Sequence, residues 1–252
     1  TSLTPWLIAC RGPRAVSDSE SQLIDLAAAC DKDPEKWARM AFDWGHGELA
    51  DYSGPREWQT EAFEEIRDHL SNPKTRFQPL MLARASGHGI GKSAFIGMVS
   101  NWALSTCDDC KVVVTANTDT QLRTKTSPEI GKWARLSITN HWFEPNAASI
   151  ASRDKAHAKT WRADFVPWSE HNTEAFAGLH NKGKRIVLIF DEASAISDKV
   201  WEVAEGALTD EDTEIIWIAF GNPTRNTGRF RECFRRFKHR WKARQIDSRT
   251  VE

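Results

Sequence analysis

The sequence predicts an α/β protein in which helices cover both faces of a mainly parallel central sheet. Short apolar runs of strand length alternate with amphipathic segments of helical length. The runs with strand character are 79–83, 111–116, 185–190 and 214–220. A glycine-spaced loop follows the first run, and two adjacent acids follow the third. Because the carboxyl ends of parallel strands meet at one edge of a sheet, we expect a binding site at that edge.

The helices are predicted from caps and from apolar spacing. Ser17 precedes a short helix over 18–30, and Asp33 followed by Pro34 opens the next one. Apolar residues recur every four positions in 56–70, which places them on one helix face. Further helices are predicted over 93–106, 127–143, 199–208 and 228–237. Residues 145–176 are less regular, and we expect a hairpin there around 160–168.

The composition limits the kinds of partner. The chain has 252 residues and a formal net charge of −1, so a site for a polyanion must be local. The odd number of cysteines predicts reduced thiols, and Cys107 and Cys110 lack the further ligands that zinc needs. The other cysteines are Cys10, Cys30 and Cys233. No apolar run reaches the ~18 residues of a membrane span, so we expect no membrane partner.

The stretch 84–93, RASGHGIGKS, has the spacing of a phosphate-binding loop between a strand and a helix. Glycines let backbone N–H groups approach a polyphosphate closely, and the helix that follows presents its positive end. The lysine then reaches the β- and γ-phosphates, and the next hydroxyl binds Mg²⁺. Ser86 replaces the usual first glycine, which its small side chain permits. The predicted binding residues are Ser86, Gly87, His88, Gly89, Ile90, Gly91, Lys92, which is also catalytic, and Ser93, which is also a metal ligand.

An acid pair, Asp191 and Glu192, directly follows the apolar run 185–190. Two adjacent carboxylates at the end of a buried strand are costly unless they meet a cation and solvent. We expect Asp191 to hold Mg²⁺ through water and Glu192 to polarise the water that attacks the γ-phosphate. Asn222 follows the next predicted strand, and its amide is predicted to sense the γ-phosphate or that water. Either motif alone is also compatible with a surface turn, but the two together disfavour that interpretation.

Trp58 and Gln59 lie at the start of the predicted helix 56–70. A glutamine amide can pair with both N6 and N7 of adenine, as it does in DNA recognition. The pair is therefore a candidate for binding the base of ATP. The alternative is a surface glutamine beside a tryptophan of the core.

Six segments, in their order along the chain, resemble the ATPase domain of tailed-phage large terminase subunits, the motors that package DNA into procapsids. They are GPREWQ, SGHGIGKS, TEAFAGLH, IVLIFDEAS, VWEVAEGALT and FGNPTRNTGRF. The resemblance covers about 35–247 and implies a RecA-like (ASCE) P-loop NTPase fold with ATP and Mg²⁺ as cofactors. It assigns adenine to Gln59, phosphate and Mg²⁺ to Lys92 and Ser93, metal and catalysis to Asp191 and Glu192, and coupling to Asn222.

The resemblance also implies an ATP-driven translocase of double-stranded DNA. Such motors work as homo-oligomeric, pentameric rings on the portal protein, with the small terminase subunit, in the host cytoplasm during virion assembly. We expect a helical lead-in over 1–54, the ATPase core over 55–247, and over 248–252 the start of a linker to an absent nuclease domain. This chain alone is therefore not expected to cut DNA. Two alternatives stay open: another RecA-like translocase or helicase, and a nucleotide-controlled assembly module without turnover.

Two features of the basic residues stay open as well. Many large terminases carry arginine where this chain has His88, and Arg84 lies four residues before it. In such rings a basic residue of one subunit can complete the neighbouring site. The candidates are Lys182, Lys184 and Arg185, with Arg84, Arg153 and Arg162 as alternatives. Ten Lys or Arg residues between 225 and 249 would bind DNA phosphates, contact another domain or subunit, or form a solvated face.

Overall fold

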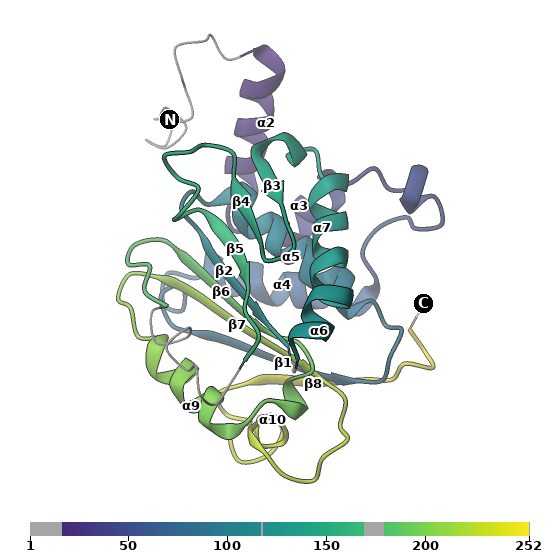
Figure 1. The fold of residues 1–252 in the computed structure, drawn as a ribbon, viewed down its shortest axis with the longest axis vertical. Helices are drawn as coiled ribbons and strands as arrows, with labels where there is room; N and C mark the ends of the chain where they lie inside the picture. The colour runs from purple at the N-terminus through teal and green to yellow at the C-terminus, as the bar shows by residue number, and fades with distance from the viewer. Residues whose placement is uncertain (1–16, 117, 169–178, 252) are drawn as a thin grey trace.

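The structure, a computed structural model, describes residues 17–116, 118–168 and 179–251. Its eight-stranded sheet has the order β3-β4-β5-β2-β6-β7-β1-β8 (Figure 1). The strands from β5 to β8 in this order are parallel, whereas β3, β4 and β5 pair antiparallel at one edge. The strands are β1 Leu80–Ser86, β2 Lys111–Thr115, β3 Phe143–Pro145, β4 Ser149–Ser152, β5 Arg162–Phe165, β6 Arg185–Phe190, β7 Glu214–Gly221 and β8 Lys242–Ile246. The predicted mainly parallel sheet is confirmed.

The four apolar runs that predicted strands are the central strands β1, β2, β6 and β7. Strands β6 and β7 are buried along their whole length, which explains their unbroken apolar sequences. The hairpin expected around 160–168 is present as the antiparallel pair of β4 and β5. Strand β8 was not predicted, because this edge strand is polar and mostly exposed.

The helices begin close to where their caps predict. The backbone N–H of Glu20 donates to the Ser17 hydroxyl over 3.2 Å, and that of Lys36 donates to the Asp33 carboxylate over 3.0 Å. The helices are α2 Asp18–Ala29, α3 Pro34–Met40, α4 Glu57–Ser71, α5 Lys92–Thr106, α6 Asp119–Gln121, α7 Ser127–Leu136, α9 Asp198–Ala207 and α10 Arg229–Glu232.

Two helices are shorter than predicted. The one expected over 127–143 ends at Leu136, where the Ser137 hydroxyl accepts the backbone N–H of Thr139 over 3.2 Å and so competes with helical hydrogen bonding. The one expected over 228–237 is reduced to α10, and turns continue to residue 240. Arginines four residues apart would face each other on a longer helix in this segment, and like charges at that spacing are unfavourable.

The helices form two layers. Helices α3, α4, α5 and α7 pack on one face of the sheet, and α9 and α10 pack on the other (Figure 1). The predicted helical cover on both faces is therefore confirmed. The indole N–H of Trp102 donates to the Cys30 carbonyl, and that of Trp37 donates to Asn101, each over 2.9 Å. These bonds attach α3 and the turn before it to α5, in the centre of the first layer.

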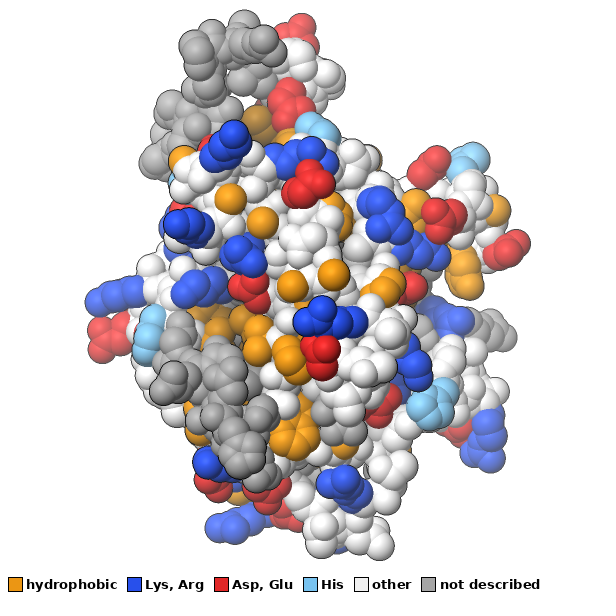
Figure 2. Space-filling view, in the orientation of Figure 1, with side chains coloured by type: hydrophobic (Ala, Val, Ile, Leu, Met, Phe, Trp, Pro, Cys, Tyr) orange, Lys and Arg blue, Asp and Glu red, His pale blue; other side chains and the backbone are white. Residues whose placement is uncertain are grey.

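The surface shows no field of one sign on the side seen in Figure 2, where basic and acidic side chains are interspersed. This pattern agrees with the net charge of −1. Among the described helices, none combines the length and the apolar character that a bilayer crossing requires.

Candidate functional site

The loop between β1 and α5 has the backbone geometry that phosphate binding requires. Gly89 and Gly91 adopt φ angles of +79° and +83°, a region that favours glycine. Gly91 is the N-cap of α5, and Lys92 is its first residue. The free N–H groups and the positive end of a 15-residue helix therefore point into the loop.

The start of α4 fastens this loop from one side. Arg56 Nη1, Trp58 Nε1 and Gln59 Nε2 donate hydrogen bonds to the carbonyl oxygens of residues 89, 90 and 91 over 3.0, 2.8 and 2.9 Å. A Cβ atom at Gly91 would lie 2.9 Å from Gln59 Nε2, so a side chain here would displace the Gln59 amide as well as strain the left-handed backbone. The loop is held in shape before any ligand binds.

The two residues predicted to bind adenine lie in different surroundings. Gln59 lines the cavity described below, but its Oε1 accepts the N–H of Arg56 over 2.9 Å, so an adenine would have to exchange this bond. Trp58 does not line that cavity, which corrects its predicted contact with the base. Its ring packs in the core on Phe95 and Phe220, with centroids 5.4 and 5.9 Å away.

One cavity of about 490 Å³ joins the loop and the acid pair. It lies at the edge of the sheet where β1 and β6 end. Among the residues that line it are His88, Gly89, Gly91, Lys92, Ser93, Asp191 and Glu192, together with Arg56, Gln59, Lys125 and Thr126. Ser86 and Ile90 are buried behind the loop, where the Ser86 hydroxyl donates to the Gly87 carbonyl over 3.0 Å. Thus the two motifs, about a hundred residues apart in the chain, face one space.

Asp191 is nearly buried at the end of β6, with 6% of its surface exposed. Burial raises the pKa of this carboxyl, the hydrogen bond from Thr126 opposes the rise, and the neighbouring Glu192 adds to it. The Thr126 hydroxyl donates to Oδ2 over 2.8 Å, and the N–H of Glu192 donates to Oδ1 over 3.1 Å. A cation beside Asp191 would favour its charged form.

Glu192 adopts a left-handed backbone, with φ +53° and ψ +41°. For a residue with a side chain this conformation costs about 1–2 kcal/mol. The chain turns sharply here from β6 into the short helix Ala193–Ala195. The turn leaves the Glu192 side chain on the wall of the cavity, beside that of Asp191.

The oxygen atoms at this site fit magnesium. The Ser93 hydroxyl and the Asp191 carboxylate are hard oxygen ligands of the kind that Mg²⁺ prefers. Across the described ranges, 17–116, 118–168 and 179–251, no three His, Cys, Asp or Glu side chains gather as a metal cage. A Mg²⁺ ion would therefore depend on oxygens of the substrate, as is usual where it accompanies nucleotide phosphates.

Asn222 does not line the cavity but reaches the loop from the end of β7. Lys92 Nζ donates to its Oδ1 over 3.1 Å and also to the Gly87 carbonyl over 3.2 Å. Asn222 therefore contacts the phosphate loop through Lys92, and its predicted role in sensing the γ-phosphate or the attacking water stays a prediction.

Several residues that line the cavity were not predicted, among them Arg56, Lys125 and Thr126. Arg56 directly precedes α4, and Lys125 and Thr126 end the π-helical segment Leu122–Thr126. The sequence around that segment shows no periodic pattern, and only its proximity in space to Asp191 reveals it. Single π-turns are frequent at functional sites, because they redirect side chains within a helix.

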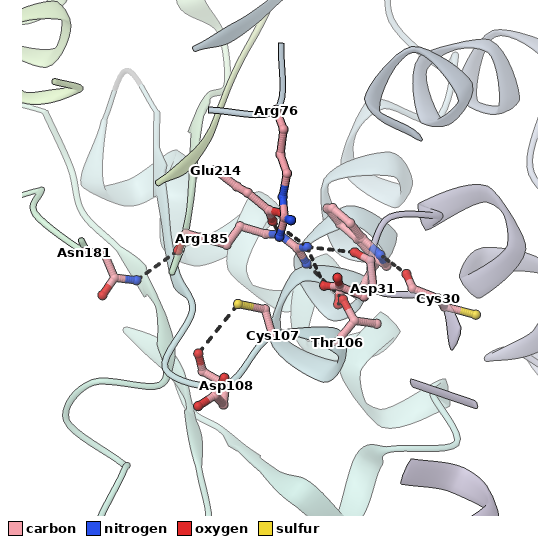
Figure 3. Close-up of polar contacts among 10 residues, drawn as sticks. Cys30, Asp31, Arg76, Thr106, Cys107, Asp108, Asn181, Arg185 and Glu214 are labelled. Carbon is pink, nitrogen blue, oxygen red and sulfur yellow. Dashed lines mark hydrogen bonds and ion pairs between the residues drawn. The ribbon is translucent and has the colours of Figure 1, made fainter. Parts of the chain in front are cut away.

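Arg185, predicted to complete the site of a neighbouring subunit, is fully buried, which corrects that prediction. Figure 3 shows its polar contacts. Its guanidinium donates to Glu214, Thr106 and Asp31 over 2.8, 3.0 and 2.9 Å. It also lies over the Trp102 ring, 4.3 Å from the centroid. Burial by itself would lower the pKa of Arg185, but the nearby acids, with Glu214 first among them, outweigh it and raise that pKa. The residue stabilises the amino-end edge of the sheet.

The other basic residues predicted to complete a neighbouring site differ in whether their side chains are buried or already paired. Arg84 is buried and bonded to Glu65 over 2.8 Å, so it does not replace an arginine of the loop. Arg153, Arg162 and Lys184 are ion-paired with Glu144, Asp164 and Asp108. Within the described part of the chain, Lys182 is exposed and makes no ion pair.

Comparison with known proteins points to one group of viral proteins. No protein-family model matches the chain. The chain is 25% identical over 218 residues to a protein of Enterobacteria phage P7 described as the probable large subunit of terminase. The match covers 84% of this chain and 42% of the relative, so the chain spans less than half of the relative's length.

Solved structures share the fold. The large terminase of bacteriophage HK97 superposes with a TM-score of 0.58 at 11% identity, over 85% of this chain and 43% of that one. The large terminase of a thermophilic bacteriophage, in complex with ADP, gives 0.51 at 11% identity, over 76% and 45%. The predicted fold class is confirmed by these neighbours. The chain is thus similar in sequence to a phage large terminase subunit and has the fold of the large terminases, as the order of its motifs predicted.

Proposed function

We propose that the chain is the ATPase part of a DNA-packaging motor and that the cavity binds ATP with Mg²⁺. The observation that supports this most directly is that Lys92 and Ser93 line the same cavity as Asp191 and Glu192. In this proposal residues 55–247 form the ATPase core, 1–54 a helical lead-in and 248–252 the start of a linker. The sequence match to the phage P7 protein supports the choice of a packaging ATPase.

Each side chain has a definite task in this proposal. The N–H groups of the loop and of the first turn of α5 bind the phosphates, and Lys92 reaches the β- and γ-phosphate oxygens. Ser93 and Asp191 hold the Mg²⁺ ion, which neutralises charge that develops on the phosphates. Gln59 binds the adenine after it exchanges the bond to Arg56 that it makes in this structure.

Glu192 acts on the water. It orients the water in line with the bond between the γ-phosphorus and the bridging oxygen, and accepts a proton as the water attacks. That bond breaks, and ADP and phosphate are released. The left-handed backbone of Glu192 favours this role, because strained residues persist where the surrounding fold requires their position.

The motor activity is the wider part of the proposal. The chain would translocate double-stranded DNA into a procapsid, as a pentameric ring on the portal protein, with the small terminase subunit, in the host cytoplasm. A basic residue of a neighbouring subunit would complete the site, and Lys182 is a candidate whose side chain is exposed and, among the described residues, not ion-paired. In that case ATP hydrolysis per subunit rises with protein concentration, and Lys182→Ala removes the rise.

The test of the ATPase proposal compares binding with turnover. Fluorescent ATP analogues report binding, and phosphate release reports hydrolysis, for the wild type, Lys92→Ala and Glu192→Gln. Glu192→Gln should bind ATP normally and lose about 10²–10⁴-fold in turnover. Lys92→Ala should weaken binding, whereas the exposed Lys159→Ala serves as the control.

Two outcomes would count against the proposal in different ways. A wild-type chain that binds no ATP would exclude the whole assignment. Normal turnover by Glu192→Gln would show that another group activates the water. Tight binding by the wild type without hydrolysis at any protein concentration would instead favour a nucleotide-controlled assembly module.

A further inference from the structure

A second cavity, of about 200 Å³, lies behind the nucleotide cavity. It forms where β1 and β7 end, beneath the segment that leads from β7 through α10. Its walls carry three arginines, Arg225, Arg231 and Arg235, and the rings of Phe230 and Phe234 also line it. No Asp or Glu is among the described residues that line it. The cavity is therefore a small hollow with positive walls in a chain whose net charge is −1.

The three arginines are available to a ligand. Within the described ranges, Arg225 and Arg235 are exposed, and their guanidinium groups make no hydrogen bond or ion pair. Arg231 pairs only with its neighbour Glu232, over 3.2 Å, and keeps donors to spare. By contrast, Arg229 and Arg240 both pair with Glu205, so these two arginines are already engaged.

Guanidinium groups on the wall of a cavity that no carboxylate lines are suited to phosphate, whose oxygens accept two parallel N–H bonds from one arginine. The segment carries more exposed cations than one phosphate needs, namely Arg236, Lys238 and Lys242. Additional exposed cations can neutralise further phosphates of a nucleic acid, and such contacts bind it without reading sequence. The surplus cations therefore favour a nucleic-acid backbone over a free phosphate ion.

We propose that the cavity walled by Arg225, Arg231 and Arg235 binds a backbone phosphate of double-stranded DNA. The inference rests on the proposed function, because it names where the substrate of the motor is held. The site would also connect the bound DNA to the nucleotide cavity through residues that contact each other. Asn222 lines this second cavity and accepts a hydrogen bond from Lys92 of the first.

A second residue connects the two cavities over a short distance in the chain. Ser194, which also lines the second cavity, lies two positions after Glu192 in the turn that ends β6. A phosphate held here would thus lie beside the turn that carries Glu192 and beside Asn222, which contacts Lys92. Displacement of that phosphate during translocation would shift Asn222 and the Lys92 contact together.

The experiment measures duplex binding by fluorescence anisotropy over a series of salt concentrations. The double variant Arg225→Gln, Arg235→Gln is compared with Lys155→Gln, Lys159→Gln, which removes the same charge from exposed positions in the β4–β5 connection. Each phosphate contact contributes roughly −0.9 to the log–log slope for duplex DNA. The arginine variant should therefore flatten the slope by about 1–2, and the lysine control should leave it unchanged.

Basal ATP hydrolysis is measured on the same proteins, because the two arginines lie outside the nucleotide cavity. The expected result is unchanged basal hydrolysis with loss of any stimulation by DNA. A slope equal to that of the wild type, or equal flattening in the lysine control, would overturn the inference while hydrolysis still stands. A wild type without hydrolysis but with the predicted slopes would overturn the proposed function and leave this binding site.

Titration with inorganic phosphate alone separates the two sources of this ligand. Under the proposal, millimolar phosphate does not compete with duplex DNA beyond the effect of the same ionic strength of chloride. Specific competition that disappears in Arg225→Gln, Arg235→Gln, together with an unchanged DNA slope, would make the cavity a site for free phosphate and would overturn the DNA assignment.

Discussion

Lys92 donates a hydrogen bond to Asn222 Oδ1 over 3.1 Å, so the phosphate loop is tied to the end of β7. The other end of the same amide, Nδ2, lies 3.0 Å from Nε2 of His88. For this contact to be a hydrogen bond the imidazole must be neutral, with its proton on Nδ1. Asn222 thus contacts both the lysine and the histidine of the loop. A bound ATP would compete with Asn222 for the Lys92 ammonium group.

The first prediction concerns this competition for Lys92. Asn222→Asp places a carboxylate beside the lysine, and a charged hydrogen bond is stronger than a neutral one by about 1 kcal/mol or more. The variant should weaken ATP binding by about fivefold or more, whereas Asn222→Ala should bind ATP at least as tightly as the wild type. Titration with a fluorescent ATP analogue measures both. Equal affinities in all three proteins would show that the contact has no influence on binding.

The second prediction concerns the support of Asp191. Thr126→Val removes the hydroxyl that donates to Oδ2 and leaves part of a buried carboxylate unsatisfied, which costs about 1–3 kcal/mol. It also removes the hydrogen bond that restrains the raised pKa of Asp191, so a cation has to displace a more tightly held proton. We expect Thr126→Val to need more Mg²⁺ for half-maximal ATP binding, and Thr126→Ser to restore the wild-type requirement. No difference between Val and Ser would argue against a metal at Asp191.

Much of the fold could be predicted because its signals are local. The runs that became β6 and β7 are buried on both faces, so their sequences are apolar throughout. Strand β8 pairs with β1 but is polar and lies at the edge, so neither period nor composition marked it. The helix expected over 228–237 has its aromatic spacing, yet the repulsion among its arginines shortens it.

The candidate site, like the fold, has a part that local sequence motifs predicted and a part that they did not. The loop and the acid pair are short contiguous motifs, and the parallel sheet brings the two together. The bond from Thr126 to Asp191 joins residues 65 positions apart, and that from Arg185 to Asp31 joins residues 154 apart. Such partners follow from packing alone. Arg185 therefore looked like an exposed cation in the sequence, although it lies in the interior beside Glu214.

The third prediction is that Arg185 is needed for stability. Arg185→Met would leave the nearly buried Glu214 with only Arg76 as a partner, and loss of one member of a buried pair costs about 3–5 kcal/mol. Urea denaturation should show this loss. Arg123→Met, which breaks the exposed pair with Asp119, should cost less than about 1 kcal/mol. Similar midpoints for the two variants would contradict the burial of Arg185.

The fourth prediction is a pH dependence from the same cluster. Burial alone would raise the pKa of Glu214, but Arg185 and Arg76 outweigh it and hold that pKa below the ordinary value of 4.5. A carboxyl with a lowered pKa in the folded state contributes stability above its unfolded pKa and loses it as the pH falls through the folded value. As the pH falls below about 4.5, the wild type should therefore lose more stability than Glu214→Gln. Parallel stability curves for the two proteins would contradict the lowered pKa.

The last prediction tests the packing of α5 against α7, which positions the loop and the segment before α7. Gly97 lies in α5 where a Cβ atom would come within 2.5 Å of the Trp133 ring, and Trp133 is fixed against Phe42. Gly97→Ala should therefore destabilise the protein by about 1–3 kcal/mol, although alanine favours a helix.

The matched control is Gly131→Ala, in α7, where the nearest other atom, the Arg135 guanidinium, lies 3.5 Å from the added Cβ. With room for the methyl group, the lower entropy of the unfolded chain should stabilise this variant by about 0.4–1 kcal/mol. The urea midpoint of Gly97→Ala should thus lie below that of the wild type, and the midpoint of Gly131→Ala above it. If both alanines stabilise the protein, Trp133 does not lie against Gly97, and the packing of α5 on α7 described here is wrong.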